Sequence, residues 1–448
     1  MSVTIDYNQF LRDISESGES VLLHIVPIDG IIHPVKSQPS VLFIRTLKTQ
    51  KTITICFSHH DCISTIPYEK VLFDLSSISN TKWTFDKKSF MQLFPVKNLY
   101  DINLYLHLWE GRTIDIHKHQ TVAHKFVYRS NKNFDNLNLV VPLLKHKEMF
   151  ESLCNEFTDE QYPIDDGYIK ENSIVVETLA ELESNGIYVN PTIFNSHFNA
   201  RIYDGNFVYS QYHIYTSTGR PSNNFDNVNY AALNNDNGVR AGFSSRYGSD
   251  GKMILIDYSA FHPRILCHLI KFPLSIDTDI YRYLGEMYFN RPITDDDIEQ
   301  SKKLTFRQLY GGVEERYEHI KYFARLKHFI DENWKNFNSD GYVLTPIFKR
   351  RITDKHVLDP NPNKLFNYIL QATETEVSIP VINAINIYLQ GHKTKTVLYT
   401  YDSLLFDFHK DDGVDTLKDI ITIMKMNNRF PIKVFGGETY NEVSQINL

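Results

Sequence analysis

Two apolar segments that lie far apart in the chain each carry an aspartate at the end of an expected strand. MILIDYSAF (253–261) is an apolar run with Asp257 near its end, which predicts a buried strand that presents a carboxylate at its tip. TVLYTYDSLLFDF (396–408) has apolar runs on both sides of Tyr401-Asp402-Ser403, which predicts a hairpin with an acid at the turn. One such acid alone is usually a cap or a salt-bridge partner. Two together supply the oxygen ligands of a two-metal phosphoryl-transfer site, because Mg²⁺ prefers carboxylates.

The size and composition of the chain indicate a globular protein of several domains. Its 448 residues predict two or three domains, and 42% hydrophobic with 23% charged residues is a globular balance. The sequence contains no run of eighteen apolar residues, and its first residues lack the layout of a signal peptide. We therefore expect a soluble, intracellular protein without membrane contact.

The cysteines and the overall charge give little indication of the kind of site or ligand. The four cysteines show no CxxC spacing, so we expect neither a disulfide framework nor a zinc site, and we interpret His59-His60-Asp61-Cys62 as a polar turn after the strand KTITICF. The formal net charge of −7 does not indicate nucleic-acid binding by itself. Residues 301–356, however, carry twelve Lys and Arg against seven Asp and Glu, so a basic region lies within an acidic protein.

The pattern of strands and helices divides the chain. SVLLHIVPI (20–28), SVLFIRTL (40–47) and KTITICF (51–57) are predicted strands of an N-terminal α/β domain. The polar, turn-rich segment FTDEQYPIDDGY (157–168) predicts a boundary. A helix is expected from Ile174 to the C-cap Gly186, and helical patterns dominate from about Ile276 to Asn338.

Six segments between residues 216 and 408 resemble motifs of one enzyme family and occur in its order. TSTGRPSNNFDNVNY (216–230), LIDYSAFHPRILCHL (255–269) and SKKLTFRQLYGG (301–312) resemble the TxTGRLSSxxPNLQN segment, motif A and motif B of family A DNA polymerases. GYVLTPIFKRR (341–351), NYILQATETE (367–376) and YTYDSLLFDF (399–408) are similar to the family's GYVETLFGRRR, its NxxxQGTAAD helix and its motif C. Six ordered matches make a chance resemblance improbable.

The resemblance implies a role for each matched residue. Asp257 and Asp402 would hold two Mg²⁺ ions, with Mn²⁺ as an alternative and the Tyr258 carbonyl as a further ligand. Lys302 would bind the triphosphate of the incoming nucleotide, in a pocket whose other expected members are Tyr258, His262, Tyr281, Phe306 and Tyr310. The residues expected to contact primer and template DNA are Arg220, Asn227, Asn367, Gln371 and Tyr401. Lys302, Phe306 and Tyr310 are spaced to share one helix face, which an ordinary amphipathic helix would also produce.

The resemblance also implies an α+β multidomain fold. Residues 1–155 would form an exonuclease-like (RNase H-like) α/β domain, and residues 156–448 a right-hand polymerase domain. Within the latter we expect a thumb remnant at about 165–215, a palm at about 216–270 and 365–448, and helical fingers at about 271–364.

The sequence departs from the family pattern in several places. Ile298 stands where motif B has an arginine, and His262 replaces the motif A glutamate that excludes ribose. The thumb helices are missing, because only residues 191–217 separate the flanking segments. The N-terminal region has no DxE and no YxxxD, so we expect a scaffold without hydrolysis, with Asp86 and Asp101 as relics of an acidic set.

We therefore expect template- and primer-dependent DNA synthesis from deoxynucleoside triphosphates, in a viral replication system and with a processivity partner. Ser403, which follows Asp402, keeps open a primer-extending RNA polymerase with the same palm, because phage-type RNA polymerases have His-Asp-Ser there. A non-catalytic DNA-binding replication subunit is the other alternative.

Overall fold

The computed structural model describes residues 6–62, 65–130, 135–157, 167–233 and 238–446. The chain divides into two compact units, Met1–Ala180 and Glu181–Leu448. Helix α8 (Gly167–Ser184) runs through the point of division, so the division falls later in the chain than the segment 157–168 predicts. Most of that segment lies outside the described residues.

The N-terminal unit is built on a five-stranded sheet of order β3-β2-β1-β4-β5. Its first three strands pair antiparallel and the last two join in parallel. The three strands expected from the sequence are confirmed: β1 (Val21–Pro27), β2 (Pro39–Thr46) and β3 (Thr52–Cys56). The short strands β4 (Lys82–Thr84) and β5 (Leu99–Asp101) complete the sheet.

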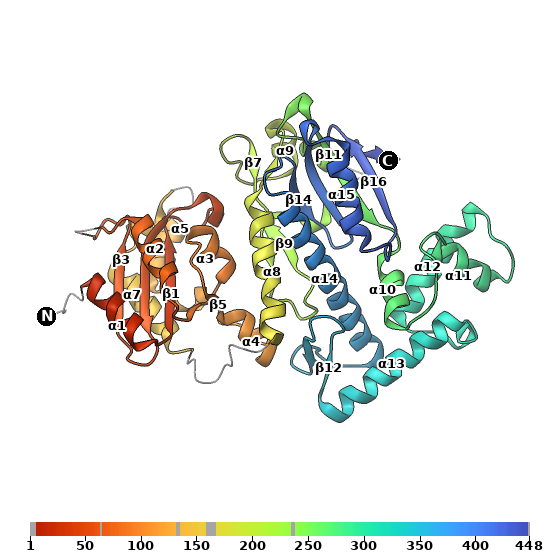
Figure 1. Cartoon of the computed structure of the whole chain (residues 1–448), viewed down its shortest axis with the longest axis horizontal. Helices are drawn as coiled ribbons and strands as arrows, with labels where there is room; N and C mark the ends of the chain where they lie inside the picture. Colours follow the sequence, from red (N-terminus) through yellow and green to blue (C-terminus); the bar gives the residue numbers. More distant parts are fainter. Residues whose placement is uncertain (1–5, 63–64, 131–134, 158–166, 234–237, 447–448) are drawn as a thin grey trace. The chain divides into compact units, whose positions relative to one another are not determined.

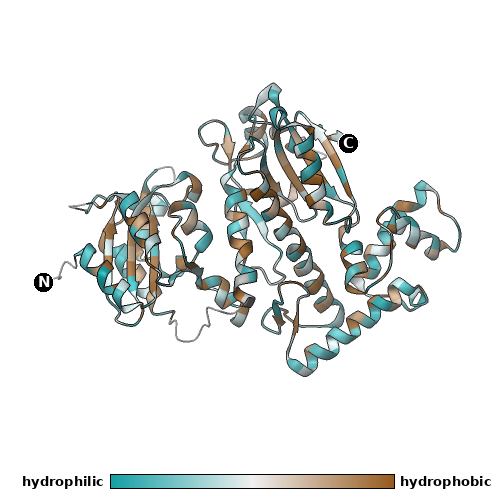
Figure 2. Cartoon of the chain, in the orientation of Figure 1, coloured by the Kyte–Doolittle hydropathy of each residue, from teal (hydrophilic) through white to brown (hydrophobic). Residues whose placement is uncertain are grey.

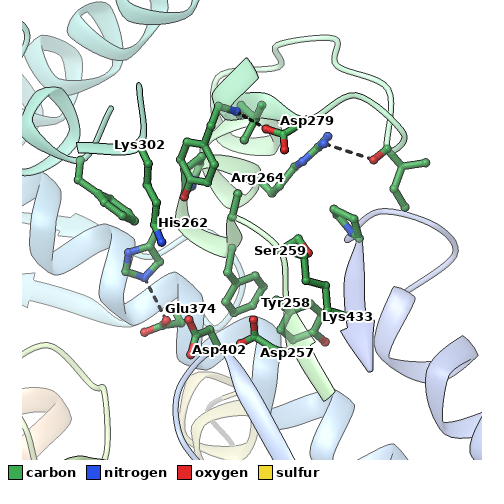
Figure 3. A pocket seen from close by; sticks show the side chains of 18 of the residues that line it. Asp257, Tyr258, Ser259, His262, Arg264, Asp279, Lys302, Glu374, Asp402 and Lys433 are labelled. Atoms are coloured by element: carbon green, nitrogen blue, oxygen red, sulfur yellow. Dashed lines mark hydrogen bonds and ion pairs between the residues drawn. The ribbon is translucent and has the colours of Figure 1, made fainter. Parts of the chain in front are cut away.

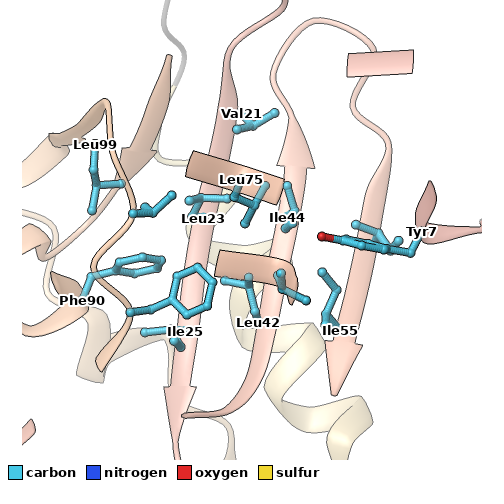
Figure 4. Packing of buried hydrophobic residues seen from close by; sticks show 14 of the residues in the cluster. Tyr7, Val21, Leu23, Ile25, Leu42, Ile44, Ile55, Leu75, Phe90 and Leu99 are labelled. Carbon is cyan, nitrogen blue, oxygen red and sulfur yellow. The ribbon is translucent and has the colours of Figure 1, made fainter. Parts of the chain in front are cut away.

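Helices cover both faces of this sheet, which explains why β1 and β2 are apolar throughout rather than alternating. On one face Leu23 and Ile44 pack with Leu75 and Phe90 in a fully buried cluster (Figure 4). On the other face Phe150 stacks on the ring of Phe43. The helices of the unit are α1 (Tyr7–Ser17), α2 (Tyr68–Ser77), α3 (Lys87–Leu93), α4 (Ile102–Glu110), α5 (Val122–Ser130), α6 (Leu137–Val140), α7 (Leu143–Cys154) and most of α8.

The expectation about the cysteines is wrong in one respect. Cys56 and Cys62 form a disulfide, because the turn after β3 brings their Cα atoms to 6.3 Å. The polar turn itself is as expected, since His59 Nδ1 accepts from the Asp61 amide. Among the described residues, no group of three or more His, Cys, Asp and Glu side chains is arranged to hold a metal ion.

The acids Asp86 and Asp101 act as helix caps. Asp86 accepts from the Ser89 amide and caps α3. Asp101 accepts from the Leu104 amide at the start of α4 and from the Lys87 amide, both at 2.8 Å. Capping bonds of this kind satisfy amides that a helix leaves free at its first turn, so both acids have a structural use.

The C-terminal unit contains a second five-stranded sheet, of order β14-β15-β11-β16-β17 and antiparallel throughout. The predicted strand is β11 (Gly251–Tyr258), and the predicted hairpin is β14 (Lys395–Tyr399) with β15 (Ser403–His409). The sheet is completed by β16 (Ile432–Gly437) and β17 (Ser444–Gln445), with α10 (Phe261–Leu269) after β11 and α15 (Gly413–Lys425) before β16.

A 27-residue helix, α14 (Pro362–Tyr388), connects this sheet to the helical part of the unit (Figure 1). It packs against α10, α12 and α13, and much of its surface is buried and apolar, as are the central strands (Figure 2). The expected helices of the region are confirmed as α11 (Ile280–Phe289), α12 (Asp295–Gly311) and α13 (Lys321–Asp340), followed by the hairpin β12 (Tyr342–Leu344) and β13 (Arg351–Thr353).

The stretch between α8 and β11 is short and contains little helix. Residues 186–222 are all described, and their single α-helix is α9 (Pro191–His197). The strands here are β6 (Ile187–Tyr188), β7 (Phe207–Val208), β8 (Tyr212–His213), β9 (Ser222–Phe225) and β10 (Val228–Asn229). Among the described helices none is both long and apolar enough to cross a membrane.

Acidification should destabilise the N-terminal unit through His24. Burial, together with the smaller effects of His146 and His124, lowers the pKa of His24 from 6.5 to about 3. Since the unfolded chain takes up this proton near pH 6.5 and the folded chain does not, stability is complete above pH 6.5 and is lost as the pH falls toward 3. At pH 5 this residue should cost about 2 kcal/mol relative to pH 7.5.

Urea unfolding of the full chain measures this cost, in a Trp334→Phe background that leaves Trp83 and Trp109 as fluorescence reporters. His24→Phe preserves a ring that can stack on Phe150. It should remove the cost of about 2 kcal/mol, which corresponds to the difference of about 1.5 pH units between pH 5 and the pKa of an unfolded histidine. The exposed His60→Gln control should keep the acid sensitivity. Identical pH dependence in the wild type and His24→Phe would contradict the prediction.

Candidate active site

A cavity of about 460 Å³ opens in the C-terminal unit where β11, the β14–β15 turn, α11 and α12 meet. Figure 3 shows Asp257, Asp402 and Glu374 on its floor, with Lys302 and His262 above them. Nine of the residues expected at the site line the cavity: Arg220, Asp257, Tyr258, His262, Tyr281, Lys302, Phe306, Tyr310 and Asp402. The fold therefore gathers segments that span residues 220–402 in the sequence.

Strand pairing brings the two aspartates together. Asp257 lies opposite Ser403 in the β11–β15 ladder, and the Tyr258 amide donates to the Asp402 carbonyl at 2.8 Å. The turn before β15 places Tyr401 in the left-handed region at φ +68°. A non-glycine residue there is strained, and such strain is typical of functional turns. In this turn it presents Asp402 beside the end of β11.

The carboxylates are held in an unfavourable environment. Burial and, to a smaller extent, the charge of Asp402 raise the pKa of Asp257 to about 7, although Lys433 and Lys302 act in the opposite direction. Burial also raises the pKa of Asp402, with Glu374 as the next cause. A site in which like charges are gathered and partly dehydrated fits a divalent cation, and two carboxylates with a strand-end carbonyl are oxygen ligands of the type Mg²⁺ uses.

Helix α12 forms the opposite wall with one face. Lys302, Phe306 and Tyr310 recur at intervals of four residues, and all three reach the cavity. The rings of Phe306 and Tyr310 stack with centroids 5.9 Å apart, and Tyr281 of α11 meets Phe306 edge-on at 6.1 Å. The Ser301 hydroxyl bonds to the Tyr281 carbonyl and fixes α11 to α12. The wall thus offers one cation and an aromatic surface.

Sequence reasoning missed Glu374, which lies on the floor of the cavity on α14. Its carboxylate is almost fully buried and lies 2.7 Å from Arg220 Nε and 3.1 Å from His262 Nε2. The other ring nitrogen of His262 bonds to the Tyr310 hydroxyl. Glu374 falls within the segment compared with the NxxxQGTAAD helix, where an acid in place of the small third residue after the Gln was the available signal.

Lys433 is a second residue that the sequence reasoning missed. It lies opposite Asp257 in the β11–β16 ladder and lines the cavity. Among the charges around Asp257 it does the most to lower the pKa of that acid. No motif marked it, because a lysine on an edge-side strand is ordinary until the pairing is known.

Four of the residues expected to contact DNA lie outside the cavity lining. Asn227 occupies the turn between β9 and β10 at φ +65°. Asn367 donates to the Tyr310 carbonyl at 3.2 Å, and Gln371 follows one turn later on α14. Tyr401 lies beneath the Arg220 guanidinium, 3.5 Å from its ring centroid. Arg220 itself lines the cavity.

The curated proteins to which this chain is similar are DNA polymerases. No family model matches the chain. The DNA polymerase of Bacillus phage SP01 is 26% identical over 352 residues, which cover 66% of this chain and 38% of the phage protein. DNA polymerase I of Pseudomonas aeruginosa is 23% identical over 240 residues, 46% of this chain and 26% of that protein. The chain thus spans less than two fifths of these curated relatives.

The fold also has a solved counterpart. A structure titled as the POL domain of Pol1 from M. smegmatis, in complex with DNA primer-template and dNTP, aligns with a TM-score of 0.70 at 12% identity. The alignment covers 98% of this chain and 99% of that one. The α+β fold expected from the sequence is therefore confirmed as that of a polymerase domain.

Neutralising one carboxylate should stabilise the protein when metal is withheld. Because the pKa of Asp257 rises from 3.8 to about 7 on folding, its contribution to stability falls as the pH rises through that window. At pH 8 with EDTA, Asp257→Asn should raise the free energy of unfolding by about 1 kcal/mol, a figure discounted for solvent screening.

Thermal unfolding with and without Mg²⁺ tests this expectation. The wild type should unfold at a higher temperature when Mg²⁺ is added. Asp257→Asn should already be more stable than the wild type without Mg²⁺ and should change little when the ion is added. Asp415→Asn, at an exposed acid on α15, is the control and should behave like the wild type. A destabilised, Mg²⁺-responsive Asp257→Asn would contradict the assignment.

Proposed function

We propose that the chain, a relative of the family A DNA polymerases, extends a primer along a DNA template with deoxynucleoside triphosphates. One observation carries the proposal: a cavity with two buried carboxylates on its floor faces a helix that presents a lysine and two stacked aromatic rings. Nucleotidyl transfer needs these parts, because little of its catalysis is covalent and most of it is positioning and charge stabilisation.

We infer that Asp257 and Asp402 hold two Mg²⁺ ions, or Mn²⁺ in their place, with the Tyr258 carbonyl as a further ligand. Such ions stabilise the attacking and leaving oxygens of an in-line displacement. The carboxylates themselves contribute fixed negative charge at the end of a rigid antiparallel pair of strands. The pKa of Asp257, raised to about 7, means that this carboxylate holds cations best above neutral pH.

The cations around the cavity suit a triphosphate. Lys302 projects from α12 and Lys433 from β16, and both interact with the charge of Asp257. We propose that Lys302 binds the triphosphate and that Lys433 supplies the second cation, in place of the arginine missing at Ile298. Phe306 and Tyr310 form a flat apolar surface against which base and sugar can stack.

On the DNA side we propose that Arg220, Tyr401, Asn367, Gln371 and Asn227 contact primer and template. Arg220 is stacked on Tyr401 and anchored to Glu374, which leaves little freedom in its side chain. A guanidinium held in this way is suited to phosphates and to the acceptors of the minor groove.

The position of Ser403 removes the support that this residue gave to the RNA polymerase alternative. Its hydroxyl pairs with Thr400 Oγ1 at 2.6 Å inside the hairpin, and it does not line the cavity. The serine is explained by the turn and says nothing about the sugar of the nucleotide. The carboxylate pair likewise has no use in a non-catalytic DNA-binding subunit.

We propose that residues 1–155 are an exonuclease-like scaffold without hydrolysis and that the polymerase part carries only a thumb remnant. The strand order β3-β2-β1-β4-β5, with one antiparallel half, supports an RNase H-like domain. The short α9 in residues 186–222 supports the reduced thumb, and fewer backbone contacts would make the enzyme depend on a processivity partner. We assign α11, α12 and α13 to the fingers and the sheet around β11 to the palm.

Primer extension should require both aspartates. Asp257→Ala or Asp402→Ala should lower Mg²⁺-dependent incorporation about 10³-fold, since each removes charge that the transition state needs. A gel-based extension assay measures the incorporation. Running it with deoxy- and with ribonucleotides distinguishes a DNA polymerase from the RNA polymerase alternative. Asp415→Asn is the matched control. Near wild-type turnover in either alanine variant would refute the two-metal site.

Mismatched primer ends should persist when nucleotides are withheld. The acids Asp86 and Asp101 are engaged by backbone amides as helix caps, so they are poor candidates for binding metal. Asp86→Ala and Asp101→Ala should lower stability, by about 1 kcal/mol for a lost cap, and leave a 3′-labelled mismatched primer as intact as the wild type does. Metal-dependent removal of the label that either variant abolishes would show an active exonuclease.

A further inference from the structure

Glu374 occupies a position that the proposed chemistry does not explain. Its carboxylate is 2% exposed, on a helix that is otherwise part of the core. One oxygen faces Arg220, and the other faces His262 of α10, as Figure 3 shows; both of these side chains reach the cavity. Since a buried carboxylate is costly without partners, these contacts define what the residue does.

The contact with His262 determines how that ring can bond. Nε2 lies 3.1 Å from a carboxylate oxygen, a charge contact that lacks hydrogen-bond geometry. A proton on Nε2 is favoured at this distance, because the carboxylate would repel an unprotonated ring nitrogen. In the neutral ring Nδ1 is then an acceptor, and its partner is the Tyr310 hydroxyl. Glu374 therefore selects one tautomer and one orientation, and the Tyr310 proton is committed to His262.

The chain Glu374–His262–Tyr310 connects α14, α10 and α12 across the cavity. Tyr310 is stacked on Phe306, so its hydroxyl end lies at the edge of the aromatic surface. A nucleotide whose base lies on that surface would bring its sugar toward the His262–Tyr310 bond. An additional hydroxyl on the sugar would contact the edge of the His262 imidazole. It would also face the Tyr310 hydroxyl, whose proton is already donated to His262.

We propose that Glu374 is the positioning residue that sets sugar selection, by holding His262 in the tautomer and orientation that occupy Tyr310. This inference rests on the proposed function only in taking a nucleoside triphosphate as the ligand. The glutamate acts through His262, without touching the nucleotide. Its second contact, with Arg220, ties the same carboxylate to the residue stacked on Tyr401.

The arrangement also explains why a glutamate at position 262 would be unfavourable in this chain. His262→Glu would place a second carboxylate against Glu374, and like charges at such a distance repel strongly in a buried site. His262→Glu alone should therefore weaken the binding of every nucleotide. Adding Glu374→Ala should relieve that loss.

The test measures binding, so it does not need turnover. The full chain is assembled on a primer with a dideoxy 3′ end, and the dissociation constants of dATP and ATP are measured opposite a templating T. In the wild type dATP should bind more tightly. Glu374→Ala should reduce the ratio of the two constants about tenfold, the size expected for one hydrogen bond, mainly by tightening ATP. Glu374→Gln keeps a side-chain oxygen beside His262 Nε2 and should stay near the wild type.

A double-mutant cycle separates this role from structural damage. In a His262→Ala background, Glu374→Ala should leave the ratio unchanged, since its effect passes through the imidazole. Equal losses in both backgrounds, or no loss in either, would overturn the proposal. If Glu374→Ala fails to fold, the His262→Glu variant with and without Glu374→Gln tests the same contact. Glu374→Gln should restore nucleotide binding there only if the Glu374 carboxylate faces position 262 and repels the new glutamate.

The outcome is distinct from that of the proposed function. A wild type that shows the binding ratio but extends no primer would refute the polymerase activity and leave the role of Glu374 intact. A wild type that extends primers while Glu374→Ala keeps the full ratio would refute this role alone.

Discussion

Two carboxylates buried beside each other at the end of one sheet are the constraint around which the C-terminal unit is built. Asp257 and Asp402 raise the cost of folding, as the pKa of Asp257 at about 7 shows, and only cations can offset that cost. Lys433 comes from the neighbouring strand and Lys302 from the facing helix. The charge imbalance that remains is the feature on which the proposed metal site rests.

Helix α14 holds the surrounding parts in place. Its apolar side chains belong to the core, and its polar ones reach outward to several segments. Glu376 accepts from the Ile347 and Phe348 amides at 2.9 and 3.1 Å, which fixes the loop after β12. Two residues earlier, Glu374 faces Arg220 and His262. A helix used in this way connects the sheet rigidly to the lining of the cavity.

Much of this architecture was predictable from patterns that depend on near neighbours in the chain. The buried strands and the acid at the hairpin turn follow from continuous apolar runs, and the shared face of Lys302, Phe306 and Tyr310 follows from a spacing of four residues. Glu374, Lys433 and the Cys56–Cys62 disulfide were not predictable in this way. Each owes its role to a partner brought close by strand register, helix packing or a turn. For Glu374 the sequence offered only an acid where the family pattern has a small residue, which does not identify its partners.

The sequence by itself determined which side chains could do chemistry here: two acids at strand ends, a lysine in line with aromatic rings, and a histidine where a glutamate was expected. Only the tertiary structure decided how they act, because charge interactions depend on distance and burial rather than on order in the chain. A carboxylate of α14, that of Glu374, lies 3.1 Å from the histidine that stands where the family pattern has a glutamate. Residues more than a hundred positions apart thus share one buried set of charges, since folding removes the water that would otherwise screen them.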